Sequence, residues 1–423
     1  MRIAAVIAEY NPFHRGHAWQ LQKAREITKA DSIVVIMSGN FVQRGVPAII
    51  DKYSRSRMAL EEGADLVLEL PLYYSLSSIE NYTRGAVSLA HMLGAVDHLC
   101  FGAEDADIHK LTGLALLTLN EDSGFQEELK KNLKLGLNYP SALSLALKEL
   151  GADDEAADIM KNPNNALGIY YIRALKSLHS DIEPCAIKRI VSGHHERNKG
   201  AYSATAVRQE IALNKESLYE LASSVPESSL QILNSRLNKG FPMDENDFSQ
   251  LLFYKLHSLY TLALQKYTDR ETARKKALSG YLDVNEELSS KILSRFREAL
   301  SFEDLCSKLK SKDLTYTRIS RCLLHILLDI KKENMELYLK DEHYYARILG
   351  LNKNAHELLH TIKEHSLVPI ISKLADYKRT ILKDEGKLMI QEDIQAADLY
   401  EFTACRKYNC LFHNEYSKEL VIY

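Results

Sequence analysis

The first apolar run of the chain constrains the fold more than any other stretch. Ile3–Ala8 is short, uncharged and rich in β-branched residues, which is typical of a strand buried on both faces of a parallel sheet. Asn11-Pro12 interrupts the run, and Leu21, Ala24 and Ile27 then recur at the spacing of one helix face. The chain therefore begins with a predicted central strand that leads into a helix.

Two histidines stand where this strand gives way to the helix, in the segment His14-Arg15-Gly16-His17. The first turn of a helix has unpaired backbone N–H groups and a partial positive charge, so it can hold phosphate. Gly16 has no side chain to block a ligand near the backbone, and imidazoles can donate hydrogen bonds to phosphate oxygens. The pair could instead decorate the helix start or bind a metal, but its place after the first strand favours phosphate.

Strand-like runs return at regular intervals through the first half of the chain. Ser32–Met37, Leu66–Leu70 and His98–Phe101 are short and apolar, and Ile182–Ile190 is a fifth run of this kind. Segments with helical spacing lie between them, for example Ile79–Leu93. This alternation is typical of a doubly wound sheet. The predicted fold class is therefore α/β, with a Rossmann-like parallel sheet.

Helical patterns dominate two other regions. Residues 111–150 have a helical pattern that Pro140 interrupts, which predicts a helical insertion around 111–160. Strand-like runs nearly vanish in the second half of the chain. We therefore expect a sheet domain over residues 1–215, followed by a mainly α-helical domain over residues 216–423.

Polar residues follow the second predicted strand, at the edge where open α/β sheets bind ligands. Ser38 and Asn40 end this strand, and Lys52 lies in the polar segment beyond it. We expect this segment to cover a nucleotide or to bind a small carboxylate. Arg55 and Arg57 could share that role or could lie on a solvated helix face.

Two later positions add candidate contacts to a nucleotide. Gly102 follows the fourth strand, where a backbone can pass close to an adenosine. Ser203, Thr205 and Arg208 open a later helix, in which both hydroxyls can cap the helix and donate to phosphate while Arg208 lies one turn further on. Alone, this pattern is that of a capped surface helix. Together with the histidine pair it predicts a second phosphate contact.

The charge balance gives no general sign of a nucleic-acid-binding protein. The formal net charge is −3, so any RNA-binding surface would have to be a local basic patch. Lys275, Lys276, Arg318 and Arg321 are candidates, and Tyr316 near them could stack on an unpaired base. Charge runs on helices are more often solvated faces, so the residues alone leave RNA binding open.

Cysteine spacing and hydropathy address metals and membranes. The six cysteines are scattered and form no C-x-x-C pair, which predicts reduced thiols and no zinc site. No apolar run approaches the roughly 18–20 residues of a membrane helix, and no signal peptide precedes the first strand. We expect a cytoplasmic protein with no membrane contact, no dedicated metal site and no obligate protein partner.

Two segments carry a family resemblance, AEYNPFHRGH at Ala8–His17 and MSGNFVQRG at Met37–Gly45. They resemble the bacterial tRNA(Met) cytidine acetate ligase family, within the HIGH-type nucleotidyltransferase superfamily. That family uses ATP to activate acetate as acetyl-adenylate, with release of pyrophosphate. It then acetylates N4 of the wobble cytidine of elongator tRNA(Met), giving N4-acetylcytidine. The KMSKS motif of the aminoacyl-tRNA synthetases is not found, which argues against an ordinary synthetase.

The resemblance implies substrates and site residues. ATP and acetate would be substrates, tRNA(Met) a partner, and Mg²⁺ would accompany the triphosphate. Residues 1–215 would be the catalytic domain, with His14, His17 and Arg208 catalytic, and residues 216–423 the tRNA-binding domain. Acetate is expected at Ser38, Asn40 and Lys52. The implied ATP site contains Ile7, Ala8, Glu9, Tyr10, Asn11, Pro12, Phe13, His14, Arg15, Gly16, His17, Gly102, Asn164, Arg189, Ser203 and Thr205.

Two other functions are compatible with parts of the pattern. A metabolic adenylyltransferase would move AMP onto a phosphomonoester, but such enzymes are mostly compact and would leave about half of this chain without a purpose. A non-catalytic RNA-binding protein could retain a degenerate nucleotide site. The combination of the histidine pair with Ser203, Thr205 and Arg208 counts against that second alternative.

Overall fold

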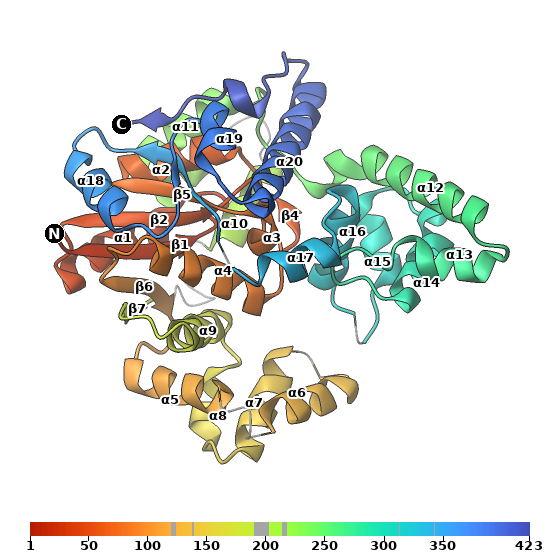
Figure 1. The fold of residues 1–423 in the computed structure, drawn as a ribbon, viewed down its shortest axis with the longest axis horizontal. Helices are drawn as coiled ribbons and strands as arrows, with labels where there is room; N and C mark the ends of the chain where they lie inside the picture. The colour runs from red at the N-terminus through yellow and green to blue at the C-terminus, as the bar shows by residue number, and fades with distance from the viewer. Residues whose placement is uncertain (120–123, 138, 190–202, 214–217, 313, 342) are drawn as a thin grey trace.

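The molecule is organised around one mixed sheet flanked by helices (Figure 1). The computed structural model describes residues 1–119, 124–137, 139–189, 203–213, 218–312, 314–341 and 343–423. Within these residues the sheet has eight strands in the order β10-β8-β5-β2-β1-β6-β7, with β9 beside β8. No helix of the described residues is both long and apolar enough to cross a membrane.

The N-terminal strands form the parallel part of the sheet. They are β1 (Ile3–Ala8), β2 (Ser32–Ser38), β5 (Leu66–Leu70), β6 (His98–Ala103) and β7 (Glu183–Lys188). The predicted central position of β1 is confirmed, since β1 pairs in parallel with β2 on one side and β6 on the other. Every residue of β1, β2 and β5 is buried, which explains why these strands are almost uncharged. The last residue of the fifth predicted strand lies outside the described residues.

Helices cover both faces of the sheet, as the alternating pattern predicts. One face packs on α1 (Arg15–Thr28) and α2 (Lys52–Glu61), and the other on α4 (Ile79–Met92) and α9 (Pro163–Ser177). The prediction that Ile27 belongs to the inner face of α1 is wrong, because Ile27 is 55% exposed. Thr28 is buried in its place, and its hydroxyl donates to the Ala24 carbonyl.

The predicted helical insertion is present between β6 and α9, below the sheet in Figure 1. It contains α5 (Ile108–Leu119), α6 (Phe125–Lys134), α7 (Tyr139–Glu149) and α8 (Asp154–Ile159). Pro140 does not break a helix, because it lies in the first turn of α7, where a helix tolerates proline. The interruption instead lies between Lys134 and Tyr139.

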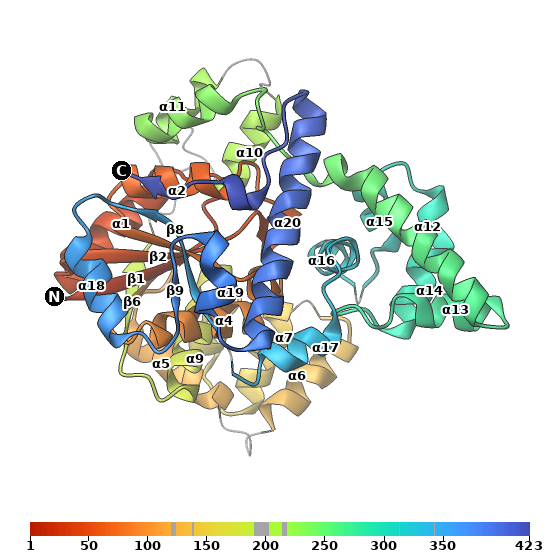
Figure 2. The same ribbon diagram turned by 45° about the horizontal axis from the view of Figure 1, so that its top comes forward.

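The second half of the chain is largely helical, and α12–α16 form a lobe beside the sheet (Figures 1 and 2). Short elements β3 (Phe41–Val42), β4 (Val46–Pro47), α3 (Leu72–Ser75) and α19 (Tyr377–Thr380) complete the fold. The longer helices of this half are α10 (Ala204–Leu213), α11 (Glu227–Arg236), α12 (Ser249–Lys266), α13 (Arg270–Ala277), α14 (Glu286–Arg295), α15 (Phe302–Leu309), α16 (Tyr316–Leu327), α17 (Lys332–Tyr338), α18 (His356–His365) and α20 (Asp384–Tyr408).

The expectation of a mainly helical chain after residue 215 misses three strands. β8 (Ala346–Leu351) pairs antiparallel with β5, β9 (Ile370–Ile371) pairs with β8, and β10 (Val421–Ile422) forms the sheet edge. The sequence pattern does not reveal them because Arg347 interrupts the apolar run of β8 and the other two strands are only two residues long. The C-terminal part of the chain therefore returns to the sheet domain.

A buried ion-pair network holds this returning segment in place. Lys52 Nζ on α2 lies 2.6 Å from carboxylate oxygens of both Glu69 and Glu415. Arg347 on β8 lies 2.9 Å from Glu69 and 2.7 Å from Glu415. All four side chains are at most 5% exposed, so each charge depends on the others for the solvation that water would otherwise supply.

We predict that Lys52→Met lowers the free energy of unfolding by about 3–5 kcal/mol, because it leaves two buried carboxylates short of a partner. Urea unfolding followed by circular dichroism measures this change. Arg57→Met on the same helix is the matched control, since Arg57 is largely exposed and pairs only with Glu61. Its expected cost is below about 1 kcal/mol. Equal effects of the two substitutions would contradict the assigned role of the network.

Candidate active site

The loop after β1 and the first turn of α1 form the centre of the candidate site. Tyr10 adopts a left-handed backbone conformation, with φ of 47°, which turns the chain away from the sheet. His14 then caps α1, and the backbone N–H of Gly16 donates to its Nδ1 over 3.1 Å. His17 completes the cap in the reverse direction, because its Nδ1 accepts the backbone N–H of His14 over 3.2 Å. This reciprocal cap fixes both imidazoles at the helix start.

The two imidazoles are stacked, with ring centroids 3.7 Å apart and planes inclined by 17°. Since Nδ1 of each ring accepts a backbone N–H, the proton of each neutral ring must be on Nε2. Tyr10 and Phe13 pack around His17, with centroids 4.8 Å and 5.5 Å from its ring. The pair therefore has a fixed orientation and offers two Nε2–H groups as hydrogen-bond donors to a ligand.

Burial decides the charge of the pair. Burial, together with the nearby guanidinium groups of Arg189 and Arg208, lowers the pKa of His14 to about 4. The pKa of His17 is well below its ordinary value because of burial, with smaller effects from His14 and Arg189. Both rings are therefore neutral at neutral pH in the unliganded protein and act as hydrogen-bond donors. The positive charge of the site comes from the arginines beside them.

Arg208 on α10 contacts the loop that precedes the histidine pair. One guanidinium nitrogen donates to the Asn11 carbonyl over 2.7 Å, and the other donates to Thr205 Oγ1 over 3.2 Å. Ser203 Oγ accepts the Ala206 N–H, which confirms its predicted capping role on α10. The structure thus brings together the histidine pair and the predicted Ser, Thr and Arg group, which are separated by nearly two hundred residues in the sequence.

Arg189 follows β7 and lies over β6. A Cβ atom on Gly102 would be 3.2 Å from Arg189 Cγ, so the space at Gly102 is occupied by the stem of this arginine. Gly16 is similar, because a Cβ there would be 2.9 Å from His14 Cε1. Both glycines make room for site side chains of the protein itself, which the sequence reasoning did not anticipate.

Asn164 supports the loop that follows β6. Its side-chain amide donates to Glu104, whose other carboxylate oxygen accepts the Asn165 N–H over 3.1 Å. Asn165 Oδ1 in turn accepts the backbone N–H groups of Glu104 and Asp105, over 2.8 and 3.0 Å. Asn162 is the N-cap of α9 but makes no side-chain capping bond. The asparagines therefore join the start of α9 to the loop beside Arg189.

Arg55 is a structural residue of the site that the sequence left undecided. It is completely buried, and its guanidinium donates to the carbonyls of Glu9, Ser38 and Gly39 over 2.7, 3.0 and 2.5 Å. These carbonyls end β1 and β2, so Arg55 holds the two strand ends together. Arg57 is instead exposed and pairs with Glu61, as a solvated helix face predicts.

Glu9 and Arg44 are charged residues that act on each other and on Arg208. Burial raises the pKa of Glu9, while Arg44, Arg208 and Arg55 lower it in that order. Arg44 also depresses the pKa of Arg208, for which burial is the larger cause. Arg44 was not among the predicted site residues, although it lies in the second segment that carries the family resemblance.

The three residues predicted to bind acetate are Ser38, Asn40 and Lys52, and each makes contacts within the protein. Lys52 has a structural role, because its ammonium is fully buried and engaged by Glu69 and Glu415. Asn40 Oδ1 accepts the Lys52 backbone N–H over 2.9 Å, which places Asn40 in a capping role before α2. Ser38 is fully buried at the end of β2, beside the Tyr82 hydroxyl.

Most of the remaining residues of the implied ATP segment are buried. Those that are buried are Ile7, Ala8, Tyr10, Asn11, Pro12 and Phe13. Arg15 differs from them, since its exposed guanidinium donates to the Ala222 carbonyl over 3.1 Å. Arg15 therefore attaches α1 to the segment before α11 in the unliganded protein. No group of three His, Cys, Asp or Glu side chains suited to a metal ion occurs among the residues that the structure describes.

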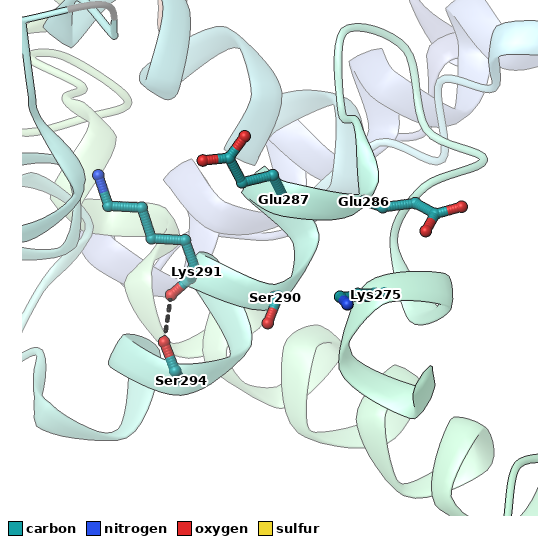
Figure 3. A pocket seen from close by; sticks show the side chains of 6 residues that line it. All are labelled: Lys275, Glu286, Glu287, Ser290, Lys291 and Ser294. Carbon is teal, nitrogen blue, oxygen red and sulfur yellow. Dashed lines mark hydrogen bonds between the residues drawn. The ribbon is translucent and has the colours of Figure 1, made fainter. Parts of the chain in front are cut away.

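The predicted RNA contacts lie on two separate helices. Lys275 and Lys276 on α13 are each 2.5 Å from a carboxylate, of Glu271 and Glu286 respectively. Arg318 is exposed in the first turn of α16, whereas Arg321 is partly buried against Gly45. Figure 3 shows the groove beside α13, which carries charges of both signs. Its lining residues are Lys275, Glu286, Glu287, Ser290, Lys291 and Ser294.

Stacked imidazoles in a helix cap, opposed by arginines at the carboxyl edge of a parallel sheet, define a nucleotidyltransferase of the HIGH type. A family model described as HIGH Nucleotidyl Transferase matches residues 1–413. The chain is 37% identical over 403 residues to the tRNA(Met) cytidine acetate ligase of a Thermoanaerobacter species, with 95% of each chain covered. It is 37% identical over 394 residues to that of Clostridium novyi, covering 92% of this chain and 94% of the relative.

A solved structure supports the same assignment. The crystal structure of Thermotoga maritima TmcAL bound with alpha-thio ATP superposes with a TM-score of 0.87 and 28% identity, over 100% of this chain and 99% of that chain. The chain therefore belongs to the tRNA(Met) cytidine acetate ligase family of HIGH nucleotidyltransferases. The resemblance seen in Ala8–His17 and Met37–Gly45 is confirmed over almost the whole length.

We predict that Gly16→Ala weakens ATP binding at least tenfold, because the new methyl group meets the His14 ring at 2.9 Å and displaces it from the helix cap. Isothermal titration calorimetry with ATP measures the change. Gly113→Ala on α5 is the control, since nothing lies within 4 Å of a Cβ at that helical position. An unchanged ATP affinity of Gly16→Ala would show that the imidazole geometry does not determine nucleotide binding.

Proposed function

We propose that this protein activates acetate with ATP and transfers the acetyl group to N4 of the wobble cytidine of elongator tRNA(Met). The products would be AMP, pyrophosphate and N4-acetylcytidine in the tRNA. The observation that carries the proposal is the convergence of His14, His17 and Arg208 at the carboxyl ends of the central strands. The names of the relatives and the nucleotide in the Thermotoga crystal structure support it.

In the first half-reaction, an acetate oxygen attacks the α-phosphorus of ATP and pyrophosphate leaves. The two Nε2–H groups of the histidine pair would donate to phosphate oxygens, while Arg189 and Arg208 would balance their negative charge. Because these donors are already fixed by the helix cap and by Asn11, little reorganisation is needed as charge develops. No covalent intermediate with the protein is required.

Mg²⁺ would enter with the triphosphate. Phosphate oxygens and water are its usual ligands in such sites, and the described residues offer no cluster of three metal-binding side chains. The part of the chain described here would therefore orient the phosphates through imidazole and guanidinium donors. The ion would neutralise the charge of the leaving pyrophosphate.

In the second half-reaction, the cytidine amine attacks the acetyl carbonyl and AMP leaves. A wobble base in an anticodon loop can unstack at low cost, so it can reach an adenylate at the sheet edge. The helical lobe of residues 249–327 would bind the tRNA, with Arg318 as an exposed basic residue of α16, the helix that packs on Gly45. With a tRNA substrate, the reaction is expected to take place in the cytoplasm.

We predict that His17→Ala lowers the rate of pyrophosphate release from ATP and acetate by about 10²–10³, because one transition-state donor is lost. A coupled pyrophosphate assay measures the rate, and thermal unfolding verifies that the variant is folded. His360→Ala, which removes an exposed imidazole on α18, should retain full activity. Wild-type release with a phosphomonoester but not with acetate would instead identify a metabolic adenylyltransferase.

We predict that Arg318→Ala weakens tRNA binding and reduces the slope of log affinity against log salt by about one, as expected for one lost phosphate contact. Filter binding at several salt concentrations measures both quantities. Lys275→Ala should have a smaller effect, because Glu271 already neutralises that ammonium. The opposite ranking would move the proposed RNA contact from α16 to α13.

A further inference from the structure

The 3₁₀ turn Glu245–Phe248 precedes α12, and the charge of Glu245 acts on Arg208 of the candidate active site. Just before this turn, the Met243 N–H donates to the Ile49 carbonyl over 2.9 Å. The Ile49 N–H in turn donates to Asn11 Oδ1 over 2.7 Å. The Asn11 carbonyl also accepts a hydrogen bond from Arg208. A short series of hydrogen bonds therefore links the segment before Glu245 to Arg208.

Helix α16 approaches the same place from the other side. The hairpin of β3 and β4 turns at Gly45, where a Cβ would be 2.7 Å from the Arg321 nitrogen and 3.0 Å from the Thr317 carbonyl. The Ser320 hydroxyl donates to the Gly45 carbonyl. Figure 1 shows β4 and α16 at the junction between the sheet and the helical lobe. The first turn of α16 is therefore held against the hairpin that carries Arg44.

The Glu245 carboxylate lies at this junction, where a backbone N–H and the Tyr316 hydroxyl donate to it. Tyr316, the first residue of α16, donates its hydroxyl to Glu245 Oε1 over 3.3 Å. Burial raises the pKa of Glu245, and the neighbouring carboxylates Asp244 and Glu303 act in the same direction. Across the junction, the charge of Glu245 acts on Arg208. The carboxylate is thus more basic than an exposed one and is only partly buried.

Two other carboxylates near the site are already engaged. Glu104 is bonded to Asn164 and to the Asn165 N–H, and the Glu9 carboxyl faces three arginines. These arginines lower the pKa of Glu9 against the larger effect of burial, whereas Asp244 and Glu303 add to the rise in the pKa of Glu245. Glu245 therefore combines proximity to Arg208 with a basic, accessible carboxylate on the lobe expected to bind the tRNA.

We propose that Glu245 receives the exocyclic amine of the cytidine and accepts its proton during acetyl transfer. A carboxylate is the natural partner of the cytosine N4–H₂ group, which has hydrogens to donate. This inference rests on the proposed function and names the residue that would act in its second half-reaction.

The step balances without another reagent. The N4 nitrogen forms a bond to the acetyl carbon, and the bond from that carbon to the phosphate oxygen breaks. AMP leaves with the bonding electron pair, while the N4 proton moves to the Glu245 carboxylate and is later released to water. Tyr316 would hold the carboxylate toward the base through its hydroxyl.

The test separates the two half-reactions. We expect Glu245→Gln to form acetyl-adenylate at the wild-type rate, as measured by pyrophosphate release without tRNA. In single-turnover assays with saturating tRNA, acetyl transfer should fall by about 10²–10⁴, the usual contribution of a general base. Glu245→Asp should recover part of this loss. Tyr316→Phe, which removes the hydroxyl but keeps the carboxylate, should lose less than Glu245→Gln.

Each other outcome overturns the inference. Transfer by Glu245→Gln within threefold of the wild type would show that Glu245 accepts no proton. Equal losses in both half-reactions, or an equal loss in Tyr316→Phe, would show that Glu245 only holds α16 against the 3₁₀ turn. Failure of the wild type to release pyrophosphate with acetate would instead refute the proposed function, independently of any Glu245 variant.

Discussion

The reciprocal helix cap of His14 and His17 is the interaction on which the site depends. A helix start must satisfy its unpaired N–H groups, and serine, threonine, asparagine or aspartate usually do so. Here imidazole Nδ1 atoms accept the N–H groups of His14 and Gly16. The hydrogen bonds that cap the start of α1 therefore also fix the ring tautomers and orient the Nε2–H groups. Structural and functional requirements are met by one pair of side chains.

Arginines complete the site from three parts of the sequence. Arg55 on α2 ties the ends of β1 and β2 together and is fully buried. Arg189 directly follows β7 and Arg208 lies on α10, and both lower the pKa of His14. Since the imidazoles are neutral, these guanidinium groups would supply the positive charge that attracts a triphosphate to the proposed site. Because a few arginines supply the positive charge locally, a chain with no excess of basic residues could bind a strongly anionic substrate.

The helical lobe is joined to the sheet domain through α16 and through the chain that follows α17. Gly45 of the β3–β4 hairpin meets α16, and the chain after α17 returns to the sheet as β8. Lys52 and Arg347 neutralise Glu69 and Glu415 where this returning chain packs. The lobe is therefore an insertion held at both ends by the sheet domain. Such an arrangement suits an enzyme that must bring a bound nucleic acid to a fixed adenylate.

The sequence by itself determined the parallel strands and the nucleotide-binding helix start. Ile3–Ala8 and Leu66–Leu70 are buried on both faces, so they had to be apolar, and their pattern predicts their boundaries correctly. His14 and His17 were recognisable because a helix cap is a local feature. Ser203 and Arg208 were found because their spacing on one helix is also local.

Only the tertiary structure decided which charged residues are structural and which face the site. Lys52 and Arg55 are three residues apart, and the pattern could not show that both are buried. Their partners lie on β1, β2, β5 and the C-terminal segment. For the same reason, β8 was hidden by Arg347, whose charge is compensated by residues distant in sequence. Local patterns record the periodicity of burial, whereas the cost of a buried charge depends on partners that only folding brings together.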